Sequence, residues 1–133
     1  MADDKKLTFS LFLLRLSVFI VMFMWTLDKF VRPAHASLVY ETFYHSPGFG
    51  YTVSYFIGAV ELVIIVGFLF GFKKTLTYGA VLLFHTISTL STYRQYAAPF
   101  AEINLLFFAA WPMLAACIAL FLLRDRDTLL SIE

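Results

Sequence analysis

Charged residues and cysteine are scarce in this sequence. Only 14% of its 133 residues are charged, against about 25% in an ordinary soluble domain. Hydrophobic residues make up 61%, which argues against a water-soluble globule and against a disordered chain. The single cysteine, Cys117, excludes an internal disulfide framework and any CxxC zinc or redox motif. The formal net charge of +1 gives no sign of a nucleic-acid partner.

Long apolar runs are what the sequence has instead. A transmembrane helix needs about 20 mostly apolar residues, and four segments meet this requirement: 9–27, 53–72, 76–93 and 101–123. Unbroken runs predict helices, because the strands of a membrane barrel would alternate over segments of about 10 residues. We therefore predict an all-α membrane protein in which 1–133 form a single four-transmembrane-helix bundle, with membrane lipid as its immediate partner.

One longer connection joins the first two predicted spans. Pro33 can open a helix in its first turn, and Pro47-Gly48 marks the end of the segment. Tyr40 and Tyr44 lie between them and suit the aromatic belt of a membrane interface. We predict a short interfacial helix over 34–44 on the outer face of the bundle.

Basic residues are divided unequally between the two sides of the predicted bundle. Six lie on the side of both termini and three on the opposite side: Lys5, Lys6, Lys73, Lys74, Arg124 and Arg126 against Lys29, Arg32 and Arg94. Because cytoplasmic loops carry the excess of lysine and arginine, we predict that both termini are cytoplasmic.

A cleaved signal peptide is the alternative interpretation of the first span. Ala34-His35-Ala36 resembles the small-residue A-x-A cleavage site. The apolar region of a signal peptide has about 7–15 residues, and the segment 9–27 is longer. We therefore keep this segment as a span of the folded protein.

Three ionisable residues stand out in the interior of the predicted spans: Arg15, Glu61 and His85. Such residues are costly in hydrocarbon and by default indicate function. At a rise of about 1.5 Å per residue, Glu61 and His85 each lie about 12 Å from the outer ends of their helices, and Arg15 lies about 18 Å from the outer end of its own. We predict that the three side chains meet in one polar cluster, in which Glu61 accepts hydrogen bonds from His85 or Arg15.

Further residues are expected to complete a ligand site at this cluster. Trp25 would form an apolar wall, and Glu102 and Asn104 approach from the start of the last span. A histidine beside a carboxylate can relay a proton or bind the carbonyl of a quinone that enters from the lipid. Haem is less favoured, because only His85 lies within a span, and no metal-ligand spacing is found. The other interpretation is a clamp between helices without a ligand.

The order of these features resembles the DoxX-like superfamily of small four-helix membrane proteins. The similarity covers about 13–96, where an arginine in the first span is followed by a lysine at its outer end and then by a glutamate and a glycine-bearing apolar run: Leu14-Arg15-Leu16, Asp28-Lys29-Phe30, Glu61-Leu62 and Gly67 to Gly71. A basic turn and a histidine-containing third span come next.

A redox-associated role is what this resemblance implies. Members of the superfamily include the small membrane subunit of a thiosulfate:quinone oxidoreductase and membrane partners of redox or stress proteins. The resemblance implies a bacterial inner membrane, a quinone-like ligand at Arg15, Glu61 and His85, and a protein partner or second copy of the chain. The alternatives are a small oligomeric transporter or proton pathway, and an assembly protein with no ligand.

Overall fold

The computed structural model describes residues 2–133, and this range is helical with no strand. Its elements are α1 (Ala2–Val31), α2 (Pro33–Phe43), α3 (Tyr51–Phe70), α4 (Lys74–Ser91), α5 (Tyr93–Ala97), the 3-10 helix η1 (Asn104–Ala109), α6 (Ala110–Leu122) and the 3-10 turn η2 (Arg124–Arg126). Three helical stretches are long and apolar enough to cross a membrane: Asp3–Val31, Tyr51–Phe70 and Asn104–Leu122. These stretches indicate an integral membrane protein.

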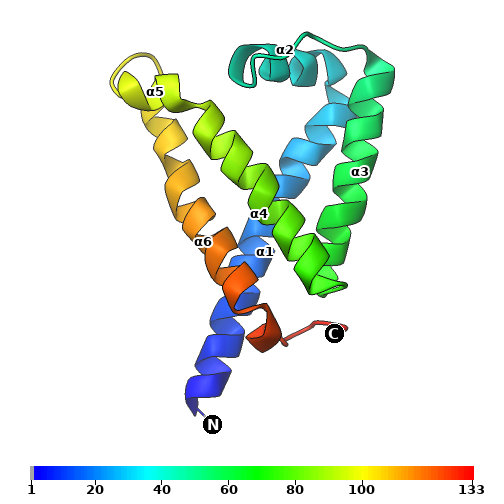
Figure 1. Cartoon of the computed structure of the whole chain (residues 1–133), viewed down its shortest axis with the longest axis vertical. Coiled ribbons are helices and arrows are strands. Elements are labelled where there is room, and N and C mark those ends of the chain that lie inside the picture. The colour runs from blue at the N-terminus through cyan, green and yellow to red at the C-terminus, as the bar shows by residue number, and fades with distance from the viewer. Residues whose placement is uncertain (1) are drawn as a thin grey trace.

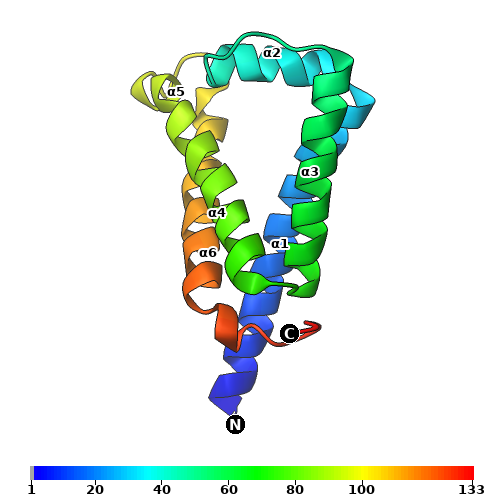
Figure 2. The same ribbon diagram turned by 45° about the vertical axis from the view of Figure 1, so that its right-hand side comes forward.

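The helices form two pairs that diverge from one end of the molecule (Figures 1 and 2). α1 packs mainly on α3, and α4 packs mainly on α6. The pairs converge at the end that holds 124–133, which we call the tail side, and α2 lies across the wide opposite end, which we call the α2 side (Figure 2). The buried apolar core joins the pairs near the tail side, where Leu11, Phe68, Tyr78 and Leu120 are almost fully enclosed.

α4 corresponds to the predicted span 76–93 but is more polar than the three apolar stretches. It runs beside α6 from the tail side to the α2 side (Figure 1). Three of its hydroxyl groups bond to carbonyls one turn earlier in the same helix: Thr86 to Leu82 and Thr89 to His85, both at 2.7 Å, and Ser91 to Ile87. Such back-bonding satisfies the hydroxyls without a partner from another helix, which lowers the cost of placing this helix in a membrane.

The predicted span 101–123 differs from a single α-helix. Its first half is the 3-10 helix η1, and α-helical geometry begins only at Ala110. Pro112 lies in the first turn of α6. A proline has no N–H to donate and is tolerated in a first turn, which is consistent with a change of helix type at this place.

Gly71 gives a stability prediction at the end of α3. Its φ of 71° is left-handed, and its N–H closes the helix by bonding to the Phe68 carbonyl at 3.2 Å. A side chain in this conformation costs about 1–2 kcal/mol, so Gly71→Ala should lower the free energy of unfolding by that amount in a detergent-denaturation measurement. Gly71→Asn should lose less, because asparagine tolerates this conformation. Equal losses in both variants would mean that contact with Ser131, rather than backbone strain, is responsible.

Candidate functional site

Arg15 belongs to a polar cluster at the tail side, away from α2. The side chain is fully buried. Its Nη1 donates to Asp127 Oδ1 at 2.6 Å, and its Nη2 donates to the Leu129 carbonyl at 2.5 Å. The Tyr78 hydroxyl donates to the other oxygen of Asp127, Oδ2, at 2.6 Å. Arg15, Tyr78 and Asp127 form what we call the tail-side cluster.

The tail-side cluster has the properties of a structural clamp. Both carboxylate oxygens of Asp127 are bonded to buried donors, and Lys74 Nζ donates to the Asp127 carbonyl at 2.7 Å. Asp127 and Arg15 are each 0% exposed, so no face of the ion pair is open to a ligand. The cluster fastens the segment after α6 to α1 and α4.

Glu61 belongs to a second cluster, close to α2. Lys29 Nζ lies 3.1 Å from Glu61 Oε2, and the Thr26 hydroxyl donates to the same oxygen at 3.1 Å. Lys29 also donates to the Trp25 carbonyl at 3.3 Å and lies 5.9 Å from the centre of the Tyr40 ring. Lys29, Glu61 and Thr26 form what we call the α2-side cluster, which joins α1 to α3.

A cavity of about 510 Å³ opens beside the α2-side cluster. Its walls come from α2, α3 and α4, with Tyr44 and Ser46 from the connection after α2. The residues that line it are mostly apolar or aromatic: Tyr40, Tyr44, Ser46, Phe56, Ile57, Val60, Glu61, Phe84 and Ile87. Concave, largely apolar sites with a few polar groups are typical of small-molecule binding.

The residues that line this cavity carry both hydrogen-bond acceptors and donors. All the bonds made by the Glu61 carboxylate use Oε2, so Oε1 has no hydrogen-bond partner among residues 2–133. The phenol groups of Tyr40 and Tyr44 likewise make no hydrogen bond within that range, and their rings lie 4.7 Å apart. The cavity therefore offers one free carboxylate oxygen and two phenols.

The environment of Tyr40 keeps its phenol in the protonated form. Burial raises the pKa of this hydroxyl above its usual value of 10, and the neighbouring Glu61 carboxylate raises the pKa further. A group whose pKa is raised in this way holds its proton throughout the neutral range. Tyr40 can therefore serve as a hydrogen-bond donor at any physiological pH.

His85 lies on a different side of α4 from the cavity. It is 8% exposed, and its Nε2 lies 2.9 Å from the Ala110 carbonyl at the start of α6. The neighbouring residue Phe84 is the one that lines the cavity. His85 thus ties α4 to α6, and no hydrogen bond joins it to Glu61 or Arg15 in the described part of the chain.

The predicted meeting of Arg15, Glu61 and His85 is therefore not found. Arg15 pairs with Asp127, Glu61 with Lys29, and His85 with a backbone carbonyl. Each lies on a separate helix, as expected, but the helices turn the three side chains towards three different neighbours. Of the three, only Glu61 lines the cavity.

The three remaining predicted site residues also lie away from the cavity. Trp25 stacks on His35 with ring centres 6.5 Å apart and lines another pocket on α1. Asn104 donates to the nearby Ala98 carbonyl at 2.9 Å. Glu102 is exposed in the turn before η1. None of them contacts Glu61 in the hydrogen bonds of the described residues.

Sequence reasoning missed the partners of the charged residues. In the sequence, Lys29 counts among the basic residues on the side opposite the termini, and Asp127 lies beyond the end of the last predicted span. An arginine and a glutamate within apolar spans each require a partner of opposite charge. This requirement is the signal in the sequence that could have led to Asp127 and Lys29. Tyr40, which the sequence assigns to an aromatic belt, also lines the cavity.

The comparisons with known proteins assign no relative. No family model, no curated protein and no solved structure matches the chain.

Proposed function

We propose that this chain is a DoxX-like membrane protein that binds a quinone-like or other lipid-soluble ligand in the cavity beside Glu61, as a subunit associated with a redox partner. The observation that carries the proposal is the free Oε1 of Glu61 beside two phenols in an apolar cavity of about 510 Å³. Sites of about 300–1,000 Å³ accept small molecules. The cavity lies beneath α2, between α3 and α4.

The polar groups of the cavity suit both redox states of a quinone-like ring. An oxidised quinone has two carbonyl oxygens, which accept hydrogen bonds, and the phenols of Tyr40 and Tyr44 are donors that line the cavity. A reduced quinol has two hydroxyl groups, which donate, and Glu61 Oε1 is the acceptor. Aromatic and aliphatic walls such as Phe56 and Phe84 would hold the ring and its hydrophobic tail.

α4 is assigned as the fourth span of this protein. Three features support the assignment: its length of 18 residues, its internally bonded hydroxyls and its position beside α6. With four spans, both termini lie on one side of the membrane. The excess of basic residues on the tail side favours the cytoplasm for that side, in a bacterial inner membrane.

Electron transfer in this proposal is assigned to a partner. Cys117 is the only cysteine of the chain, and it is buried among apolar side chains of the core. A buried thiol of this kind is inert in redox exchange. The chain would then hold the ligand while a partner protein exchanges electrons with it.

Glu61→Gln should release a co-purifying quinone. The glutamine side chain would keep the shape of the site but lose the charge that accepts a quinol hydroxyl and pairs with Lys29, and hydrogen bonds to charged groups contribute about 1.5–3 kcal/mol. The expected result is a loss of at least about tenfold in bound quinone, measured by native mass spectrometry and solvent extraction of the purified protein. The matched control is Glu41→Gln, an exposed glutamate of α2 that does not line the cavity.

Tyr40→Phe keeps the proposal testable if Glu61→Gln fails to fold. This variant removes one donor and leaves the Lys29–Glu61 pair in place. Retention of quinone by both variants would remove the basis of the site. Two alternative functions have their own outcomes: pH-dependent flux in liposomes that Glu61→Gln abolishes would indicate a proton pathway, and a loss of stability with no ligand in the wild-type protein would indicate an assembly protein.

A further inference from the structure

We propose that a second pocket, at the end of α1 on the α2 side, binds a phospholipid through its phosphate group. This pocket, which we call the Trp25 pocket, has a volume of about 380 Å³ and is lined by Met24, Trp25, Leu27, Asp28, Val31, Arg32 and His35. It shares no residue with the cavity beside Glu61. The proposal is independent of the quinone-binding function.

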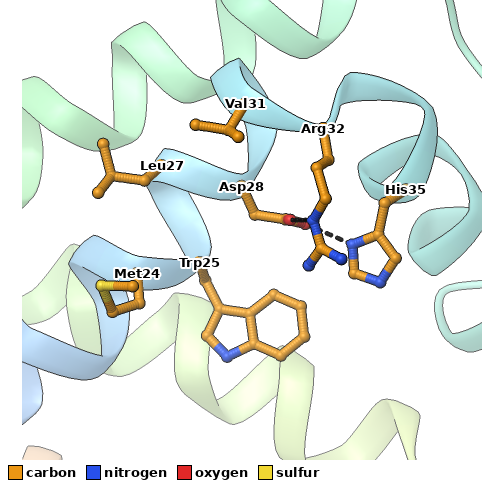
Figure 3. A pocket seen from close by; sticks show the side chains of 7 residues that line it. All are labelled: Met24, Trp25, Leu27, Asp28, Val31, Arg32 and His35. Carbon is orange, nitrogen blue, oxygen red and sulfur yellow. Dashed lines mark hydrogen bonds and ion pairs between the residues drawn. The ribbon is translucent and has the colours of Figure 1, made fainter.

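Asp28 holds the polar wall of the Trp25 pocket in place (Figure 3). Arg32 Nε donates to Asp28 Oδ1 at 2.7 Å, and His35 Nδ1 lies 2.5 Å from Asp28 Oδ2. The carboxylate is thus engaged on both oxygens and is only 9% exposed. The role of Asp28 is to orient the arginine and the histidine rather than to meet a ligand.

Arg32 offers the groups that would recognise a phosphate. Its Nε is the only nitrogen of the guanidinium with a hydrogen-bond partner among residues 2–133, so Nη1 and Nη2 are both free, and the side chain is 64% exposed. A guanidinium binds two phosphate oxygens through a planar pair of N–H donors. Its orientation is already fixed by Asp28, which lowers the entropy lost on binding.

The apolar wall of the Trp25 pocket is formed by residues of α1 that precede Arg32. Met24, Leu27 and Val31 line the pocket, and Met24 is eight residues, or about 12 Å, deeper along the helix. Met24 and Val31 are strongly exposed, at 60% and 74%. One acyl chain of the phospholipid would lie along this apolar wall.

The depth of the pocket selects a phospholipid over a free anion. Arg32 directly follows the apolar stretch Asp3–Val31, so with this stretch in the membrane its guanidinium would reach the lipid phosphates, and the indole of Trp25 suits the same interface. A free phosphate would use Arg32 alone and would leave the apolar wall exposed. A phospholipid covers both walls with one molecule, because its phosphate stands above its acyl chains.

A lipid titration tests this inference on the delipidated full chain in detergent. Native mass spectrometry would follow the binding of phosphatidylglycerol, of a galactosyl diacylglycerol with the same acyl chains but no phosphate, and of inorganic phosphate. Arg32→Gln should weaken phosphatidylglycerol binding at least about tenfold, with little change in galactolipid binding. Arg32→Lys, which keeps the charge but not the paired donors, should give an intermediate loss.

Arg94→Gln is the matched control. Arg94 is an exposed arginine near the same end of the bundle that contacts the ring of the adjacent Tyr93 and lies outside the pocket. Three results would each overturn the proposal: equal affinity for the galactolipid, an equal loss in Arg94→Gln, or binding of inorganic phosphate as tight as that of the phospholipid. Quinone retention should be unchanged in Arg32→Gln, so this test and that of Glu61→Gln fail or succeed separately.

Discussion

Asp127→Asn is expected to lower the free energy of unfolding by about 3–5 kcal/mol. The substitution leaves the Arg15 guanidinium fully buried without its counter-charge, and Arg15 Nε already lacks a hydrogen-bond partner in the structure. The free energy lost is that of an uncompensated buried charge, which exceeds the net contribution of the intact pair. Thermal or denaturant unfolding of the detergent-purified protein measures the change.

The same end of the molecule supplies a control for this prediction. Arg126 Nη2 and Asp4 Oδ1 form an ion pair at 2.9 Å in which both side chains are more than half exposed. Exposed pairs contribute about 0–1 kcal/mol, so Asp4→Asn should change stability by no more than that. Similar losses in Asp127→Asn and Asp4→Asn would contradict the assignment of a buried clamp.

A double substitution separates the charge from the packing. Arg15→Met combined with Asp127→Leu removes both charges and fills similar volume, and such replacements of buried pairs are often neutral or stabilising. We expect this variant to recover most of the stability lost in Asp127→Asn. A double variant as unstable as the single one would show that the hydrogen bonds to Tyr78 and the Leu129 carbonyl dominate.

The sequence predicted the helices better than it predicted their partners. Run length and apolar content place α3 and α4 within two residues of the predicted spans 53–72 and 76–93, whereas α1 (Ala2–Val31) extends beyond the predicted span 9–27 at both ends. Helix positions can be predicted in this way because the length and apolar content of a helix are properties of its own residues. η1 is the exception, since a 3-10 geometry leaves no clear trace in apolar composition.

The rotation of each helix is what the sequence could not supply. In a uniformly apolar span no polar face marks the side that turns inwards, and lipid gives no hydrophobic drive to choose one. Equal depth along the axis therefore made Glu61 and His85 look like neighbours, whereas the structure turns His85 towards α6 and Glu61 towards α1. The partner of Arg15 lies outside the predicted spans altogether, at Asp127.

Gly58→Leu is expected to lower the free energy of unfolding by about 1–3 kcal/mol and to weaken the proposed ligand site as well. Gly58 lies where α3 approaches α1, and a Cβ there would stand 2.8 Å from the Phe30 ring and 3.3 Å from Lys29 Cβ. The larger side chain must move Phe30 and push α1 away from α3. Since Glu61 is one turn further along α3, the distance from Lys29 to Glu61 should increase.

Two comparisons decide whether close packing is the cause. Gly50→Leu places the same side chain where an added Cβ meets no atom within 4 Å, so its loss should stay within the smaller cost of a leucine at a helix N-cap, about 1 kcal/mol. Phe30→Ala combined with Gly58→Leu frees the space that leucine needs and should recover both stability and quinone retention relative to Gly58→Leu. If the double variant were no better than the single one, the close approach of α1 and α3 at Gly58 would not be what holds Lys29 against Glu61.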